Sequence, residues 1–181
     1  MTLNLLILVL VFTTSSFSSI QNWTWKRYAF GSPSLSIELP TPSEKTNLKL
    51  SEDMSAKVKT IETYQVSSSG LFVMMSFLEY KEGVVTDAKK AAQGAMANVR
   101  AQAGLTDFTV EYKELSISGK RAVQVKARYR KGTTPMGFSG VYIVEGQKLW
   151  QVNLGYATSD LKAQEASERI LRSIRFIPSK S

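Results

Sequence analysis

The sequence predicts an α+β fold, in which helices pack on a central sheet of mainly antiparallel strands. Three observations predict it: strand patterns joined by short turns over residues 56–81 and 108–156, two amphipathic helices near residues 86–104 and 159–174, and an apolar content of 43%. Strands that follow one another through tight turns pair antiparallel, and a helix with one apolar face must cover a sheet or another helix. The 181 residues are enough for one domain with its own hydrophobic core.

The N-terminal segment predicts export. Residues 5–12 form an unbroken apolar run, which is shorter than the roughly 20 residues that span a bilayer and matches the apolar part of a signal peptide. Small residues follow, and they predict cleavage after Ser18, or otherwise after Ser16. We therefore expect a signal peptide at residues 1–18 and a periplasmic or extracellular domain at residues 19–181. No Lys or Arg precedes Lys26, so an uncleaved, membrane-tethered form is the alternative.

The first half of the domain reads as strands followed by a helix. Residues 24–30 and the alternating residues 35–39 predict strands, and the polar residues 40–55 predict a long exposed loop. Residues 56–67 and 71–81 predict a hairpin, whose second strand is apolar at both alternating sets and should be central and covered on both faces.

The first predicted helix is capped by Thr86 and ended by Gly104. Its inner face consists of small or flexible apolar residues, so we expect it to lie close to the sheet: Ala88, Ala92, Ala95, Met96, Val99 and Ala103.

The second half predicts four strands, a helix and a short final strand. The strands cover residues 108–118, 121–130, 138–145 and 148–156, with turns at Gly119-Lys120 and Gly146-Gln147 and a loop at residues 131–137. The last helix should start near Ser159 and run to about Ile174, ahead of a strand at residues 175–177. Its buried stripe is expected to consist of Ala163, Ala166, Ile170, Leu171 and Ile174.

The composition excludes several chemistries. The chain has neither cysteine nor histidine, so it has no disulfide, no thiolate nucleophile and no imidazole base or metal ligand. No glycine pattern for binding nucleotide phosphates is present. We therefore expect no catalytic residues, no cofactor and no metal site, and we expect a protein that is not an enzyme.

The strongest candidate site is a basic stripe on residues 108–130. The formal net charge is +8, and alternation places Lys113, Lys126, Arg128 and Arg130 on one face with the single carboxylate Glu111. A two-residue turn at 119–120 would put Lys113 opposite Lys126 and Glu111 opposite Arg128, and like charges facing each other across strands cost stability.

The stripe favours an anionic partner: an acidic protein, an anionic lipid or an envelope polymer. Lys120, Arg121 and Lys131 would extend it. The aromatic side chains of this hairpin fall on the opposite face, which disfavours nucleic acid because stacking needs aromatics among the cations. The alternative is an ordinary solvated sheet face without a partner.

Three segments resemble the PsbP-like family of α/β/α sandwich proteins. They are Phe30 with residues 35–40, residues 117–122 and residues 166–176, and the resemblance covers about residues 25–177. The family includes the PsbP subunit of photosystem II and many small exported bacterial proteins. The resemblance implies the fold and a non-catalytic accessory or binding role, and it brings no site residues because the matching motifs are structural.

Two other functions remain open from the sequence. A carboxylate-dependent envelope hydrolase would need a concave pocket with two inward carboxylates, for which Glu62 and Glu79 are the candidates. A membrane-surface protein would be held by its uncleaved N-terminus together with the basic stripe.

Overall fold

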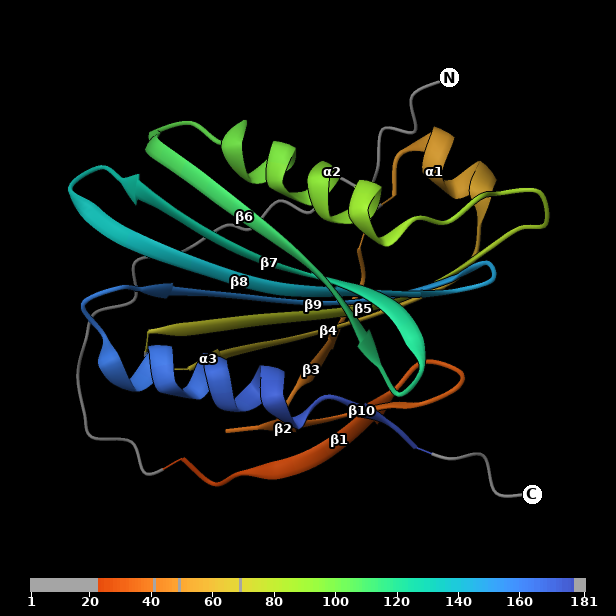
Figure 1. Cartoon of the computed structure of the whole chain (residues 1–181), viewed down its shortest axis with the longest axis horizontal. Helices are drawn as coiled ribbons and strands as arrows, with labels where there is room; N and C mark the ends of the chain where they lie inside the picture. Colours follow the sequence, from red (N-terminus) through yellow and green to blue (C-terminus); the bar gives the residue numbers. More distant parts are fainter. Residues whose placement is uncertain (1–22, 41, 49, 69, 178–181) are drawn as a thin grey trace.

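The computed structural model describes residues 23–40, 42–48, 50–68 and 70–177. The predicted signal peptide, with Ser16 and Ser18, lies outside these residues. Figure 1 shows a layered arrangement in which α2 lies on one side of a large sheet, and α3 lies on the other side with a small sheet.

The large sheet has seven strands in the order β3-β4-β5-β9-β8-β7-β6. Its strands are Glu44–Thr46 (β3), Val58–Ser68 (β4), Leu71–Tyr80 (β5), Leu105–Ile117 (β6), Lys120–Lys131 (β7), Thr134–Glu145 (β8) and Lys148–Ala157 (β9). The small sheet has the order β1-β2-β10 and consists of Lys26–Phe30, Leu35–Leu39 and Arg175–Phe176. All these neighbours pair antiparallel, which confirms the predicted fold class.

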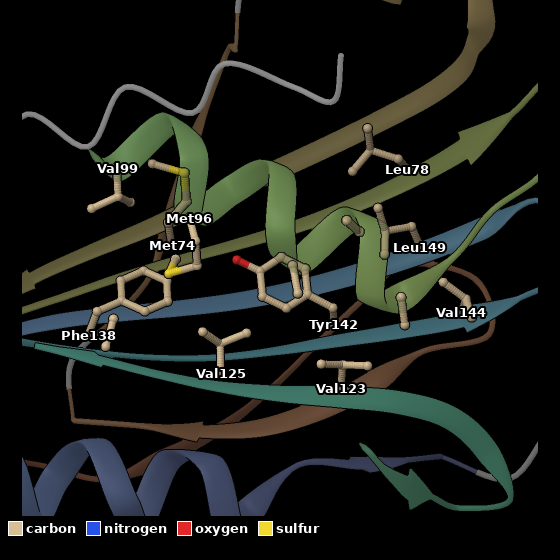
Figure 2. Packing of buried hydrophobic residues seen from close by; sticks show 14 of the residues in the cluster. Met74, Leu78, Met96, Val99, Val123, Val125, Phe138, Tyr142, Val144 and Leu149 are labelled. Carbon is tan, nitrogen blue, oxygen red and sulfur yellow. The ribbon is translucent and has the colours of Figure 1, made fainter. Parts of the chain in front are cut away.

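Each face of the large sheet has its own hydrophobic core. One core lies under α2, where Met96 and Val99 face Phe138 and Tyr142 (Figure 2). The other core joins the sheet to α3 and the small sheet, and Trp150 is its largest fully buried side chain. β5 contributes to both cores, which confirms the predicted central strand and follows from its apolar residues at both alternating sets.

The helices are shorter than predicted, and the cap of α2 differs from the prediction. α2 spans Ala88–Arg100, and its N-cap is Asp87, whose carboxylate accepts a hydrogen bond from the Lys90 N–H. The hydroxyl of Thr86 instead donates to the carbonyl of Gly146. α3 spans Leu161–Ser173 and is capped by Asp160. In α2 the capping carboxylate stands one residue after the expected Thr86 hydroxyl, and in both helices the carboxylate also interacts favourably with the positive end of the helix dipole.

The buried faces of the helices agree with the prediction, with a few exceptions. In α2 the fully buried residues are Ala88, Ala91, Ala92, Met96 and Val99, and Ala103 is exposed beyond the end of the helix. In α3 they are Ala163, Ala166, Ser167 and Ile170, while Leu171 is half-buried. Ile174 is buried just after the helix ends.

The predicted loop at residues 40–55 is wrong. It contains β3 and the short helix α1, Glu52–Lys57, which is capped by Ser51 and buries Met54. Such short elements are stabilised by packing against β4 rather than by a repeating apolar pattern. One methionine among polar residues gave no periodic signal.

The predicted loop at residues 131–137 is also wrong. The chain turns at Gly132-Thr133, and β8 begins at Thr134. Pro135 lies opposite Arg130 within the sheet, and its carbonyl accepts a hydrogen bond from the Thr158 N–H. A proline breaks a strand only where its missing N–H is needed. The prediction placed Pro135 in a loop, and the start of the strand was therefore placed too late.

The turn between β6 and β7 lies one residue earlier than predicted. Ser118 and Gly119 both have positive φ, 51° and 80°, as the favoured two-residue hairpin turns require. Ile117 therefore pairs with Lys120, and each β6 residue faces a β7 residue two positions earlier than expected.

Glu38 ties the small sheet to α3. Its carboxylate accepts hydrogen bonds from Arg27 at 2.6 Å and from Arg169 at 3.2 Å, and its backbone N–H donates to the Ser173 hydroxyl at 2.8 Å. The Arg169 guanidinium also lies over the ring of Trp25, 4.0 Å from its centroid. Hydrogen bonds from Arg169 and then Arg27 hold the pKa of Glu38 below its usual 4.5.

This carboxylate should make stability depend on acid pH. A lowered pKa in the folded state means that the contribution of Glu38 is present above pH 4.5 and is lost as the pH falls through the lowered pKa. We expect Glu38→Gln to lower the melting temperature at neutral pH, and the difference from wild type to shrink below pH 4.5. Thermal unfolding at a series of pH values measures this. Glu165→Gln, an exposed α3 residue, is the control, and an equal effect of both variants would contradict the assignment.

Candidate functional site

The basic side chains of β7 project from the α3 side of the sheet. Ala122 packs in the core beside α3, whereas Val123 and Val125 pack under α2. Successive side chains of a strand alternate between the faces. Lys126 and its neighbours at alternate positions, Arg128 and Arg130, therefore share the face of Ala122, and all three are exposed.

Lys113 joins them from β6, but its cross-strand partner differs from the prediction. It pairs with Gln124, and Glu111 pairs with Lys126. The expected like-charge pair of Lys113 and Lys126 does not form, because the turn lies at 118–119. The four residues still share one face, and we call Lys113, Lys126, Arg128 and Arg130 the basic face.

Of these four cations, Arg130 is the one that forms an ion pair within the described residues. Arg130 lies 4.0 Å from the Asp107 carboxylate and donates to the carbonyl of Thr133 at 3.0 Å. Among the residues that the structure describes, Lys113, Lys126 and Arg128 form no ion pair. The basic face therefore keeps a net positive charge, with Glu111 opposite Lys126 and Asp107 near Arg130 as its neighbouring carboxylates.

The predicted extension of this stripe is not formed. The ammonium of Lys120 pairs with Glu145 and lies 4.9 Å from the ring centroid of Phe176, and its side chain is only 16% exposed. Arg121 and Lys131 occupy odd-numbered positions of β7, so they project from the α2 side of the sheet.

The two candidate carboxylates of a hydrolase each have a separate partner. Glu62 accepts from the Gly31 N–H at 3.3 Å, and Glu79 forms an ion pair with Lys59 at 3.0 Å. Glu62 lies opposite Phe77 and Glu79 opposite Thr60, so they are diagonal neighbours on one sheet face. One open hollow, about 520 Å³ in volume, lies between loops at one end of the sheet, and neither carboxylate lines it.

Other groups that could carry chemistry are engaged in packing. Burial raises the pKa of Tyr80 to about 12 and also raises the pKa of Tyr129 and Tyr142, so these phenols remain protonated at neutral pH.

Within the described ranges, Asp and Glu side chains do not gather in groups of three that could hold a metal ion. The described helices are also too short or too polar to cross a membrane.

The contact between Asp107 and Arg130 could not be seen in the sequence. Residues 105–107 belong to β6, and the ladder is irregular between Thr106 and Thr109, with Asp107 at φ 53°. Aspartate tolerates this left-handed conformation better than most residues. That preference was the only signal in the sequence, and it does not identify a partner.

Comparison with known proteins identifies the fold. No family model matches the sequence, and no curated protein matches it. The solution structure of cyanobacterial PsbP (CyanoP) from Synechocystis sp. PCC 6803 superposes with a TM-score of 0.59 at 11% identity, covering 91% of this chain and 99% of that one.

Two further structures are more distant. A Pseudomonas aeruginosa protein of unknown function, described as a putative regulator, gives a TM-score of 0.45 at 14% identity, covering 87% of this chain and 99% of that one. LpqN of Mycobacterium tuberculosis, involved in cell envelope biogenesis, gives 0.48 at 15% identity, covering 85% and 92%. The similarity to cyanobacterial PsbP, together with the layered sheet and helices, shows that this chain has the PsbP-like fold.

Proposed function

We propose that this protein is an exported, non-catalytic accessory module that binds an anionic partner through its basic face. The observation that carries the proposal is the set of cations Lys113, Lys126 and Arg128, which are exposed on one sheet face and form no ion pair among the described residues. Glu111 is the only carboxylate alternating with them on these strands.

The charge distribution supports binding rather than a purely structural role. Lys126, Arg128 and Arg130 follow one another at alternate positions of β7, and like charges this close repel one another. An anionic partner would neutralise them and would be attracted from a distance, since the whole chain carries a net charge of +8. Such attraction is screened beyond about 8 Å at physiological salt.

The composition and fold support the non-catalytic part of the proposal. The chain has no cysteine or histidine, and Glu62 and Glu79 lie outside the described hollow. β6 and β7 leave part of the α3 side of the sheet exposed for contact, although a fold by itself does not determine a function.

The basic face can be tested by replacing its β7 residues together. We expect Lys126→Ser, Arg128→Ser and Arg130→Ser in one variant to weaken binding to heparin and to anionic vesicles at least tenfold, because the three charges supply the attraction. Binding of the wild type should fall steeply with salt. Affinity measured at several salt concentrations tests both expectations, and unchanged circular dichroism shows that the fold is intact.

A second triple variant controls for net charge. Lys45→Ser, Lys81→Ser and Lys90→Ser remove three exposed cations outside the basic face and change the net charge equally. This control should retain most of the binding. Equal losses in both variants would show that overall charge acts without a defined site, and unchanged binding in the first would exclude the basic face.

A further inference from the structure

β6 is a long edge strand whose outer side is unpaired in the part of the chain that the structure describes. It has 13 residues and lies at the end of the seven-stranded sheet, where it pairs only with β7 (Figure 1). An edge strand presents a row of unpaired N–H and C=O groups, and natural proteins usually keep such edges short or blocked. The average strand has about 5–6 residues.

The backbone irregularity of β6, which is one device that blocks an edge, is confined to its start, while the charged residues Glu111, Lys113 and Glu114 lie further along the strand. The irregularity lies between Thr106 and Thr109, and from Thr109 to Ile117 the pairing with β7 continues without a shift. β6 contains no proline. Its regular part therefore keeps the geometry that a further strand needs.

The two faces beside this edge differ in chemistry. On the α2 side, Phe108, Val110 and Tyr112 are half-buried against the core. The Phe108 ring stacks on Tyr129 with centroids 5.9 Å apart, and the Arg100 guanidinium lies 4.8 Å from the centroid of the Phe108 ring. On the α3 side, Lys113 stands beside Glu111 at the edge and next to the basic face of β7, and Leu115 and Ile117 pack against the other core.

We propose that the β6 edge binds an extended acidic segment of another polypeptide as an eighth strand. Its backbone would pair with β6, its apolar residues would cover the row Phe108, Val110 and Tyr112, and its alternate carboxylates would lie over the basic face. Addition of a strand to a sheet edge gives affinity through the backbone and specificity through alternate side chains. This inference rests on the proposed function, because the basic face selects the acidic residues.

The spacing of strands makes the charge contact feasible. Neighbouring strands lie about 4.8 Å apart, so a carboxylate on the added strand would stand next to Lys113 and about 10 Å from the β7 backbone. Lys126 and Arg128 have long side chains and reach toward it from β7. A second copy of this chain fits the edge less well, because two β6 strands would bring two basic faces together.

The test uses a nine-residue peptide that alternates valine and glutamate, together with two N-methylated versions. One carries methyl groups on the valine amides and the other on the glutamate amides, so charge and side chains are identical. In a strand, amides of alternate residues point to opposite edges. We expect one methylated peptide to bind at least tenfold more weakly than the parent in fluorescence anisotropy, and the other to bind like the parent. A valine–lysine peptide should not bind.

The outcomes separate this inference from the proposed function. Equal binding of the two methylated peptides would exclude strand addition, and so would a failure of all three glutamate peptides to bind. If strand addition is excluded in this way while the variant with Lys126, Arg128 and Arg130 replaced by serine loses heparin binding, the proposed function of the basic face is retained without strand addition.

Unchanged peptide binding by that variant would show that the basic face does not select the acidic residues of the added strand, and would contradict this inference while leaving the proposed function to the heparin result. Sedimentation should show a monomer, and a dimer that the peptide must dissociate would assign the edge to a second copy. Hydrogen exchange should show slower exchange in β6 when the parent peptide is bound, and unchanged exchange there would overturn strand addition.

Discussion

Replacing Gly31 with alanine is expected to lower the free energy of unfolding by about 2–4 kcal/mol. Gly31 has φ +76°, which an L-residue adopts only at a cost, and a Cβ there would lie 2.5 Å from Nε1 of Trp150 and 2.9 Å from the ring of Phe77. Both neighbours are almost completely buried, so neither can move away without disturbing the core. Urea unfolding followed by tryptophan fluorescence measures the loss.

Gly83→Ala is the matched control for this prediction. Gly83 has φ +83°, but no atom lies within 4 Å of a Cβ at this position. The variant therefore has the backbone strain without the collision and should lose about 1 kcal/mol. Equal losses at Gly31 and Gly83 would show that the close approach to Trp150 contributes nothing.

Trp150→Ala is expected to cost about 3–5 kcal/mol, which is a large part of the stability of an ordinary domain. Trp150 is completely buried and joins the two sheets. Its ring centroid lies 5.2 Å from that of Phe77 on β5 and 4.9 Å from that of Phe176 on β10. Truncation would leave a cavity between the large sheet, α3 and the small sheet, and urea unfolding measures the effect.

Trp150→Phe separates packing from polarity. Among the described residues, the indole N–H of Trp150 has no hydrogen-bond partner. Phenylalanine would remove this buried polar group while retaining an aromatic ring, so we expect a loss of less than about 1.5 kcal/mol.

Trp150→Phe should partly restore the stability lost in Gly31→Ala, because it removes Nε1 of Trp150, which the new methyl group would meet at 2.5 Å. Losses that simply add in the double variant would show that the two sites do not interact.

The fold could be predicted largely from local patterns. Alternating apolar residues at 35–39 and short turns between the strands after residue 105 fix the antiparallel pairing. The failures occurred where packing overrides pattern: Met54 stabilises a helix in a segment read as a loop, and Pro135 lies within a strand. The order of strands across the large sheet could not be derived, because β5 pairs with β9 across an intervening helix and three strands.

The candidate site was only partly predictable. Alternation is enough to place Lys126, Arg128 and Arg130 on one face, because it depends only on the strand. The cross-strand partner of Lys113 depends on which two residues form the turn, and a shift of one turn position moves the pairing by two residues. Ion pairs such as that of Lys120 with Glu145 join different hairpins, and no local pattern reports such contacts.

The small sheet brings together strands from opposite ends of the domain. β2 pairs with β1 on one side and with β10, at residues 175–176, on the other. As the ribosome releases the N-terminus first, β2 must wait for its second neighbour until almost the whole domain has been synthesised. The chain between β2 and β10 is the longest that any described strand pair closes, so we expect this pair to form late. We therefore expect the small sheet to be completed after the strands of the large sheet have paired.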